Sequence, residues 1–364
     1  MIRMRKPMLV ALVLTFGLLA AACGSSSSSK PNNKGSDAGG SSTTAPPAPL
    51  AAATLNGSGA TFPQAYYETL IQAFKTAQPA VTLTYAGGGS GKGQTDLQGG
   101  LVQWAGTDST VKLEDAAKFK GPFLYFPTVA APITVSYNLS GVKLALSPDT
   151  LAGIFGGTIT KWDDAAIKAD NAGVALPSTT ITVAHRADGS GTTANFTKYL
   201  VAAAPTAWKL GTDKVVAWPA GQQAGQGNAG VAQIVKSTVG SIGYVDYSDA
   251  KAGALVFASL KNASGKLVAP SLESATAALD GATLGADLTY NPLNATGAGA
   301  YPITAPTYFL VYAAQTDPAV KAALKGFLEY IYADGQDLAK TVDFAPLPDA
   351  ILTAAKAQIA KIGA

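Results

Sequence analysis

The sequence predicts an α/β protein, because strand patterns alternate with helix patterns along most of its length. From Leu55 onward, short runs of alternating apolar residues are followed by segments with apolar residues at helical spacing. Polar, glycine-rich turns lie at several strand-to-helix junctions. Hydrophobic residues make up 48% of the 364 residues and charged residues 13%, enough apolar material for two ordinary domains. Ligands of parallel α/β sheets bind where the strands end, so these turns form the candidate site.

Residues 1–22 are expected to be a secretory signal peptide. Three basic residues, Arg3, Arg5 and Lys6, precede a short apolar run, as in export signals. The run is shorter than the roughly 20 apolar residues of a membrane span. The whole chain has 26 basic and 23 acidic residues, so loss of this segment leaves equal numbers of each. The remaining chain has no basic run and no basic-aromatic stripe, and no nucleic-acid partner is expected.

The only cysteine, Cys23, directly follows the predicted signal peptide. Residues 19–23, Leu-Ala-Ala-Ala-Cys, resemble a bacterial lipobox, in which the cysteine carries the lipid; Ala20 stands where leucine is preferred. A single cysteine excludes an internal disulfide. The following residues are rich in Ser, Gly, Pro, Thr and Ala, a composition typical of a flexible tether with a reach of roughly 30 Å. We expect residues 23–54 to be a lipid anchor and flexible, disordered linker.

The folded part is expected to open with a strand, a turn and a helix. A strand over residues 54–56 leads into the glycine-rich turn over residues 57–63. The helix that follows has apolar residues at i, i+3, i+4 and i+7, which are Tyr67, Leu70, Ile71 and Phe74. Pro63 suits its first turn, because proline at that position loses no intrahelical hydrogen bond.

Further strands are expected over residues 81–85, 102–106 and 180–185. The first leads into a triple glycine followed by Ser90, the second ends at Thr107-Asp108, and the third leads into residues 186–192. Phe196 and Leu200 mark the helix after this third turn. The pattern also predicts a strand over residues 307–312 and a mostly helical C-terminal part from Asp317.

The residues at these turns suit a phosphate ion. Helix N-termini offer unpaired backbone N–H groups and a positive dipole end. Serine and threonine hydroxyl groups can rotate toward the oxygens of the anion. The guanidinium of Arg186 can bind two oxygens at once, and Asp188 can hold that guanidinium in place.

At these turns the chain resembles the phosphate-binding component of bacterial phosphate ABC transporters. The resemblance extends from Leu55 to the C-terminus. Its motifs are Gly-Ala-Thr-Phe-Pro at 59–63, Gly-Ser-Gly at 89–91, Gly-Thr-Asp at 106–108, Arg-Ala-Asp-Gly-Ser-Gly-Thr at 186–192, Lys-Trp-Asp-Asp-Ala-Ala-Ile at 161–167 and Gly-Ser-Ile-Gly-Tyr-Val at 240–245. The first and fourth of these are the most specific.

The resemblance implies a role for each residue of the candidate site. Thr61 would bind phosphate through its hydroxyl, Phe62 through its backbone N–H and Ser90 through both kinds of donor. Asp108 would accept a proton of the phosphate, and Arg186 would form the ion pair. The other implied residues are Asp188, which would orient Arg186, and Ser190, Gly191 and Thr192, which would close the cage. Gly91 departs from the family, where a second serine is common.

The resemblance further implies a two-lobed periplasmic-binding-protein (Venus-flytrap) fold with a discontinuous first lobe. Lobe one would comprise residues 55–130 plus 303–364, and lobe two residues 131–302. The implied function is high-affinity extracytoplasmic binding of inorganic phosphate between the lobes and its delivery to an ABC-type membrane permease. We expect a monomer, anchored by its lipid at the outer face of the cytoplasmic membrane or in the periplasm.

The residues of this sequence support other functions less well. Gly91-Lys92 would complete a nucleotide-binding P-loop only with glycine five residues before Gly91 and Ser or Thr after Lys92, but Ala86 and Gly93 occupy those positions. A surface-anchored adhesin or structural protein is the least specific interpretation of the sequence.

An extracytoplasmic hydrolase acting on phosphate esters is the main alternative. Ser90 and Ser190 lie in tight glycine turns, but neither matches Gly-x-Ser-x-Gly. The only histidine, His185, lies at a strand end, and one histidine with one cysteine cannot form a usual zinc site. We expect no cofactor and no metal, although a carboxylate site for magnesium or calcium without a motif stays open.

Overall fold

The computed structural model describes residues 48–363, all within a compact unit that begins at Pro47. The predicted signal peptide, Cys23 and most of the predicted linker lie outside the described residues. Strand β1 (Ala53–Gly59) begins inside the predicted linker, and the backbone N–H of Leu50 donates to Gln78 Oε1 at 2.8 Å. The chain thus joins the folded body earlier than its composition predicts. Over these residues no helix combines the length and apolarity that a membrane crossing needs.

The first part of the body is a layer of parallel strands joined by helices. Strand β1 pairs in parallel with β2 (Val81–Gly87) and β3 (Trp104–Thr107). Helix α1 (Gln64–Ala77) connects β1 to β2, and α2 (Ser90–Gly99) connects β2 to β3. The three predicted strands and the first helix are therefore confirmed, with shifted ends. Helix α1 buries the apolar positions that predicted it.

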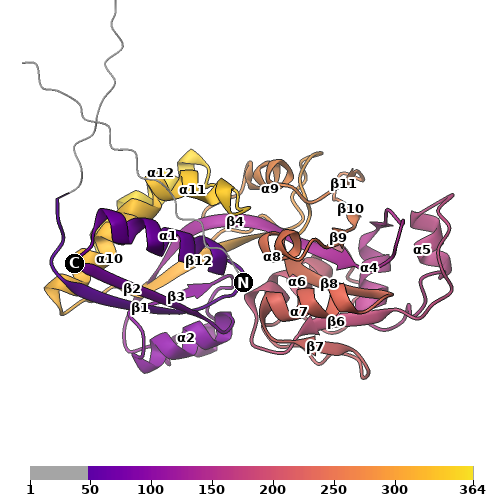
Figure 1. The fold of residues 1–364 in the computed structure, drawn as a ribbon, viewed down its shortest axis with the longest axis horizontal. Helices are drawn as coiled ribbons and strands as arrows, with labels where there is room; N and C mark the ends of the chain where they lie inside the picture. The colour runs from indigo at the N-terminus through magenta and orange to yellow at the C-terminus, as the bar shows by residue number, and fades with distance from the viewer. Residues whose placement is uncertain (1–47, 364) are drawn as a thin grey trace, which may run out of the picture. The chain divides into compact units, whose positions relative to one another are not determined.

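Two long antiparallel strands add to the parallel pairing that the sequence predicts, and one of them contains the predicted strand over residues 307–312. Strands β4 (Phe123–Tyr137) and β12 (Thr304–Tyr312) pair with each other, giving the order β2-β1-β3-β12-β4-β8-β6-β7 in the main sheet. Both run between two groups of elements (Figure 1). The sequence pattern does not predict β4, because Pro127 and Pro132 lie within it and proline cannot donate to a ladder. The register of β12 against β4 shifts between Thr307 and Tyr308, opposite Pro127.

The second group of elements repeats the strand-and-helix plan. Strand β6 (Thr182–Arg186) pairs in parallel with β7 (Gln223–Gly225) and β8 (Ser241–Asp246). Helix α6 (Gly191–Ala203) follows β6, and α7 (Gly227–Ser237) follows β7. The smaller elements are α3 (Leu113–Ala116), β5 (Ala145–Leu146), α4 (Pro148–Phe155), α5 (Ala165–Asp170), α8 (Tyr247–Ala252), β9 (Val256–Phe257), β10 (Ser259–Lys261), β11 (Leu267–Val268) and α9 (Leu272–Leu279).

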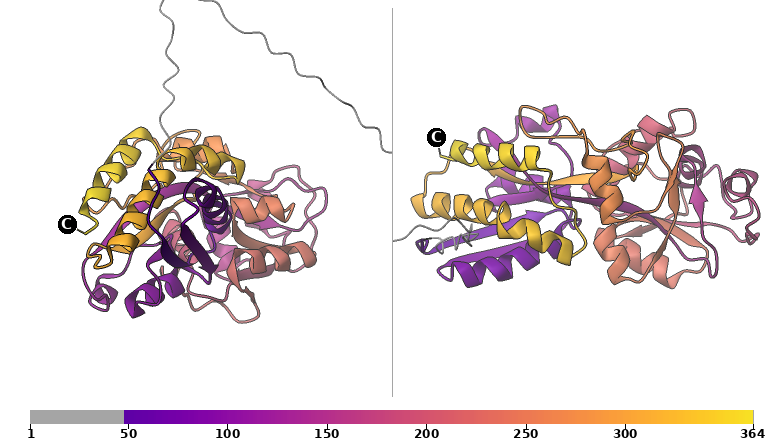
Figure 2. Two further views of the ribbon diagram at one scale, coloured as in Figure 1. Left: turned by 60° about the vertical axis from the view of Figure 1, so that its left-hand side comes forward. Right: turned by 90° about the horizontal axis from the view of Figure 1, so that it is seen from above.

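The C-terminal helices return to the first group of elements, as Figure 2 shows. They are α10 (Pro318–Ile331), α11 (Asp334–Thr341), α12 (Asp349–Gln358) and the short 3₁₀ helix Ile359–Lys361. Helix α10 packs near β1, and α11 packs near α1. The fold is therefore two-lobed. We call the group β1–β3 with α1, α2 and α10–α12 the first lobe and the group β6–β8 with α6–α8 the second lobe. The predicted lobe boundary at 130/131 falls inside β4, which both lobes share.

Aromatic side chains fill the interior of each lobe. In the first lobe, the buried Trp104 ring stacks between Tyr85 and Phe309, with centroid distances of 4.9 and 4.4 Å. In the second lobe, Tyr244 stacks on Phe196 at 4.5 Å. Burial of such large rings contributes more than burial of any other side chain to a core. These cores hold the strand ends, and with them the polar turns, in fixed positions.

Candidate functional site

The polar turns predicted from the sequence come together at the strand ends of the two lobes. Thr61 lies between β1 and α1, Ser90 begins α2, and Asp108 follows β3. From the second lobe, Arg186 ends β6 and Ser190 caps α6. All of these side chains are buried except that of Thr61, which is half-buried. Residues from both lobes therefore share one buried polar region.

A buried ion pair between Arg186 and Asp188 forms the charged centre of this region. Arg186 Nε donates to Asp188 Oδ1 at 2.8 Å, and Nη2 contacts Oδ2. The two side chains are 1% and 7% exposed. The other terminal nitrogen, Nη1, lies 3.4 Å from Thr192 Oγ1. Asp188 thus fixes the guanidinium so that one edge of it faces the Thr192 hydroxyl group.

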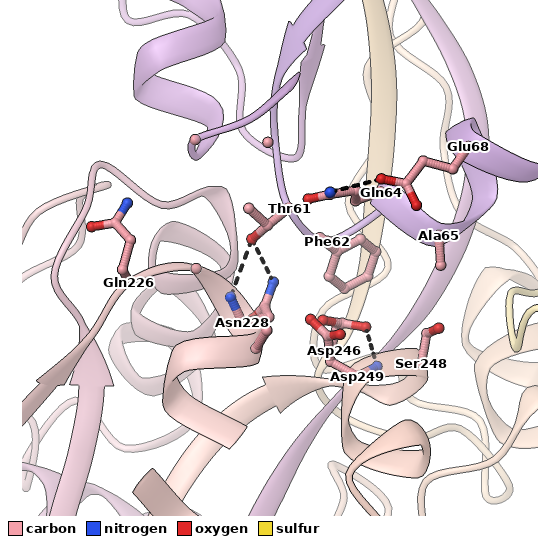
Figure 3. Close-up of a pocket in the computed structure, with 14 residues that line it drawn as sticks. Thr61, Phe62, Gln64, Ala65, Glu68, Gln226, Asn228, Asp246, Ser248 and Asp249 are labelled. Atoms are coloured by element: carbon pink, nitrogen blue, oxygen red, sulfur yellow. Dashed lines mark hydrogen bonds between the residues drawn. The ribbon is translucent and has the colours of Figure 1, made fainter. Parts of the chain in front are cut away.

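Asn228 links the two lobes at this point, and the sequence analysis missed it. Its backbone N–H and its Nδ2 donate to Thr61 Oγ1 at 3.2 and 3.1 Å, contacts drawn in Figure 3. The same Nδ2 lies 3.3 Å from Thr192 Oγ1. Asn228 lies in the first turn of α7, after Gly227, whose φ is +66°. The signal was a further glycine-rich turn at 225–228, but the three-residue strand before it carries no periodic pattern.

Asp108 is held by three partners that come from distant parts of the chain. Thr307 Oγ1 donates to its Oδ1 at 2.7 Å, Ser90 Oγ donates to its Oδ2 at 3.3 Å, and Asn195 Nδ2 donates to its carbonyl oxygen at 2.6 Å. Burial raises the pKa of Asp108 to about 7, against the opposing effects of the Thr307 hydrogen bond, the Arg186 charge and the Ser90 hydrogen bond. The sequence analysis did not identify Thr307 or Asn195 as site residues.

The loop that carries Ser190, Gly191 and Thr192 packs closely against the first lobe. The backbone N–H of Gly91 donates to the carbonyl oxygen of Gly189 at 2.8 Å. A Cβ atom on Gly191 would lie 2.3 Å from Ser90 Oγ, closer than any real contact. A Cβ atom on Gly91 would lie 3.1 Å from Gly189 O. Glycine at both positions therefore allows the close approach of the backbones.

The remaining predicted residues have structural partners. Ser190 Oγ accepts from the Thr193 N–H at 3.0 Å and so caps α6. The buried Phe62 ring packs edge-on against Phe344. His185 hydrogen-bonds through Nδ1 to the Arg186 carbonyl oxygen and stacks on Trp218, and burial lowers its pKa. Among residues 48–363, no cluster of His, Cys, Asp and Glu side chains has a metal-binding arrangement.

Two cavities flank this polar region. One of about 400 Å³ is lined by residues of both lobes, among them Thr61 and Asn228 (Figure 3). The other, of about 160 Å³, reaches Asp108 and is lined by three lysines, Lys112, Lys198 and Lys214. Desolvation lowers the pKa of Lys198 and of Lys214. Asp213, the ion-pair partner of Lys112, also lines this cavity. Lys198 and Lys214 therefore give the approach to the buried site a small excess of basic groups, which favours an anion.

Comparisons with known proteins agree on one family. Residues 43–335 match the model of the PBP superfamily domain. The chain is 36% identical over 318 residues to the phosphate-binding protein PstS of Pasteurella multocida, with 84% of this chain and 90% of the relative covered. It is 36% identical over 311 residues to the phosphate-binding protein PstS 3 of Mycobacterium tuberculosis, covering 81% and 83% of the two chains.

Solved structures share the fold. The periplasmic phosphate-binding protein PfluDING, bound with phosphate, has a TM-score of 0.70 at 24% identity, covering 84% of this chain and 94% of that one. The phosphate-binding protein from Stenotrophomonas maltophilia has a TM-score of 0.67 at 22% identity, covering 84% and 93%. At these identities the similarity establishes the two-lobed architecture.

The raised pKa of Asp108 predicts a pH-dependent stability in the ligand-free protein. The folded state holds the proton more tightly than the unfolded state, so Asp108 contributes stability below its ordinary pKa, and this is lost as pH rises toward about 7. Asp108→Asn removes this pH-dependent contribution to stability, because the amide does not titrate. Urea unfolding between pH 4 and pH 8 measures the free energy of unfolding of both proteins. The stability of the variant relative to the wild type should increase as pH rises and should become constant above the folded-state pKa of Asp108. Asp280→Asn, at an exposed position, is the control. If the free energies of unfolding of wild type and variant differ by the same amount at every pH, the pKa of Asp108 is not raised in the folded protein.

Proposed function

Because the chain belongs to the PstS phosphate-binding proteins of the PBP superfamily, we propose that it captures inorganic phosphate between its two lobes and delivers it to the permease of an ABC transporter. The observation that carries this proposal is the buried Arg186, held by Asp188 and with Nη1 3.4 Å from the Thr192 hydroxyl group, in a region that Thr61 and Ser90 of the first lobe also reach. A buried cation with donors converging around it suits a compact, multiply charged anion. The relatives from Pasteurella multocida and Mycobacterium tuberculosis are named as binding proteins, which supports binding rather than hydrolysis.

Each residue of the site has a part in this proposal. Arg186 supplies the charge, and the hydroxyl groups of Thr61, Ser90 and Thr192 supply rotatable donors. Helices α1, α2 and α6 begin at the same region, and their N-terminal ends would supply backbone N–H groups, among them that of Gly191 in α6 and that of Phe62, which directly precedes the N-cap of α1. Ser190 completes the turn by capping α6. Asn228 and Thr307 position Thr61 and Asp108.

Asp108 would select phosphate over sulfate. At neutral pH phosphate carries at least one proton, and an ionised Asp108 can accept a hydrogen bond from it. Sulfate carries no proton, so the same carboxylate would face an oxygen lone pair. A buried acceptor left without a donor costs roughly 1–3 kcal/mol, and more when it is charged.

Phosphate binding would favour the closed arrangement of the lobes. Thr61, Ser90 and Asp108 belong to the first lobe, whereas Arg186 and Thr192 belong to the second. A ligand held by both lobes stabilises the form in which they meet. Strands β4 and β12, which both lobes share, are the connection across which such a movement would occur.

We further infer that the protein acts outside the cytoplasmic membrane as a lipid-anchored monomer. The support is the signal pattern of residues 1–22 and the position of Cys23 directly after it. Acylation at Cys23 would hold the protein at the outer face of the membrane, within reach of the permease. The polar segment that follows would act as a tether.

Arg186→Ala should weaken phosphate binding at least about tenfold, because charge-assisted hydrogen bonds are worth roughly 1.5–3 kcal/mol each. Arg186→Lys should give an intermediate affinity, since it keeps the charge but loses the planar fork. Calorimetric titration with phosphate measures both, and Lys161→Ala, at an exposed position of the second lobe, is the control. Circular dichroism establishes that the variants are folded. Wild-type affinity in a folded Arg186→Ala variant would show that Arg186 does not bind the anion.

Asp108→Asn should narrow the preference for phosphate over sulfate at pH 8 by about tenfold, because the amide can donate to sulfate. In the wild type, sulfate affinity should rise as pH falls below about 7, the pKa of Asp108. In the variant this rise should be absent. Competition binding measures both effects, and an unchanged preference in the variant would place the discrimination elsewhere.

Cys23→Ala in the full-length precursor should release the protein from the membrane and leave phosphate affinity unchanged. Detergent phase partition of cells that express each form measures membrane association, and calorimetry measures affinity. Equal membrane retention of both forms would contradict lipid attachment at Cys23.

A further inference from the structure

Strand β4 contains one residue more than β12 at the point where the two strands pass the proposed phosphate site. Thr307 of β12 pairs with Val129 of β4, and the next residue, Tyr308, pairs with Pro127. Thr128 therefore has no partner in the ladder, which is the arrangement of a β-bulge. Bulges are common next to functional sites, where the local bend redirects a side chain. The side chain redirected here is that of Thr307.

Thr307 is held at both its backbone and its hydroxyl group. Its hydroxyl donates to Asp108 Oδ1 at 2.7 Å, and its carbonyl oxygen accepts from Thr128 Oγ1 at 3.4 Å. The Tyr67 hydroxyl lies 3.3 Å from the same Thr128 oxygen. A hydroxyl group has one proton to donate, so Thr128 uses its proton on Thr307 and Tyr67 is the donor to Thr128. Tyr67, Thr128 and Thr307 are fully buried, so bulk water does not compete for these contacts.

The contact with Thr307 determines which hydrogen-bonding role Asp108 has. A donor aimed at a carboxyl oxygen favours the ionised form, which can only accept. Ser90 Oγ also donates to Asp108, but to the other oxygen and at the longer distance of 3.3 Å. Burial raises the pKa of Asp108, and the Thr307 hydrogen bond is the largest of the effects that oppose this rise, ahead of the Arg186 charge.

We propose that Thr307 is a positioning residue whose hydroxyl group sets the preference of the site for phosphate over sulfate, a role that rests on the proposed function. While Thr307 donates to it, Asp108 is an acceptor, and only an anion that carries a proton can satisfy it. Without that donor, Asp108 would hold a proton of its own at neutral pH and would donate it to either anion. Thr307 need not touch the anion, since its only proton is used on Asp108.

Thr307→Val removes the hydroxyl group and leaves the ionisable groups around Asp108 in place. The charged ones are Arg186 on β6 and, around the cavity that reaches Asp108, Lys112, Lys198, Lys214 and Asp213. The tyrosines near Asp108 stay neutral, because burial raises their pKa values; they are Tyr67, Tyr85 and Tyr308. Valine has the same branched shape as threonine, so the substitution tests the hydroxyl group alone.

Competition of sulfate with phosphate between about pH 6 and pH 9 tests the proposal. In Thr307→Val the rise of sulfate affinity with falling pH should begin about one pH unit higher than in the wild type, because the carboxylate has lost a donor. A shift of that size lowers the preference for phosphate at pH 8 by about fivefold. Thr307→Ser keeps the hydroxyl group and should restore the wild-type profile.

Thr304→Val is the matched control on the same strand. It removes another fully buried hydroxyl group of β12, one that donates to the Tyr301 carbonyl oxygen at 3.0 Å, and it should keep the wild-type profile. A wild-type profile in folded Thr307→Val would overturn the proposal. An equal shift in Thr304→Val, or a shift that Thr307→Ser does not reverse, would do the same. Circular dichroism establishes folding, and Thr307→Ala replaces the valine variant if that variant does not fold.

A second measurement separates this proposal from the proposed function. Carboxyl ¹³C NMR follows the titration of Asp108 in the ligand-free protein, and its signal is the one missing from Asp108→Asn. If the wild type binds no phosphate, the proposed function fails, but the titration midpoint of Asp108 should still be about one pH unit higher in Thr307→Val. Equal midpoints in the two proteins would show that Thr307 does not control Asp108.

Discussion

A guanidinium cannot be buried alone, and the pairing of Arg186 with Asp188 is the constraint on which the rest of the site depends. Desolvation of an unpaired charge costs far more than the few kcal/mol by which a domain is stable. Asp188 is two residues away, so the turn itself supplies the counter-charge. The backbone N–H of Gly227 also donates to Asp188 Oδ1, at 3.1 Å. The ion pair therefore fixes the guanidinium and the start of α7 together, and it leaves one edge of Arg186 toward Thr192.

The two lobes differ in what they bring to the region between them. The second lobe contributes the cation and tight glycine turns, and the first contributes hydroxyl groups and the buried Asp108. The cavities on either side differ in their charged residues: three lysines and two aspartates line the one that reaches Asp108, whereas three carboxyl groups and no basic residue line the one beside Thr61. The side with the lysines is the more favourable one for an anion. This polarity is a property of the assembled lobes, since neither lobe alone contains all of the residues of either cavity.

The sequence predicts those parts of the site that are local in the chain. Arg186, Asp188 and Ser190 lie within five residues, and Ser90 lies in a glycine-rich turn, so composition and spacing identify them. Thr307 could not be found in this way, because its contact with Asp108 joins positions 199 residues apart. Strand β4 could not be predicted because it contains two prolines, which cannot donate a hydrogen bond to a neighbouring strand. The strand accommodates them through a register shift and through pairing with β12, neither of which is visible in the local sequence pattern. The cavity that Thr61 and Asn228 line likewise exists only through contacts between distant segments.

The register shift in β12 has a consequence for proton balance. Thr307, the last residue before the shift, donates to Asp108, and β12 is one of the two strands that the lobes share. A change of twist at this point alters the distance from the Thr307 hydroxyl to a carboxyl group whose pKa is about 7. Because this hydrogen bond lowers the pKa of Asp108, a movement of the lobes that lengthened it would raise that pKa and lead to uptake of a fraction of a proton near neutral pH. The enthalpy of ligand capture would consequently include the ionisation enthalpy of the surrounding buffer, and the protein would exchange protons with the medium each time it opens.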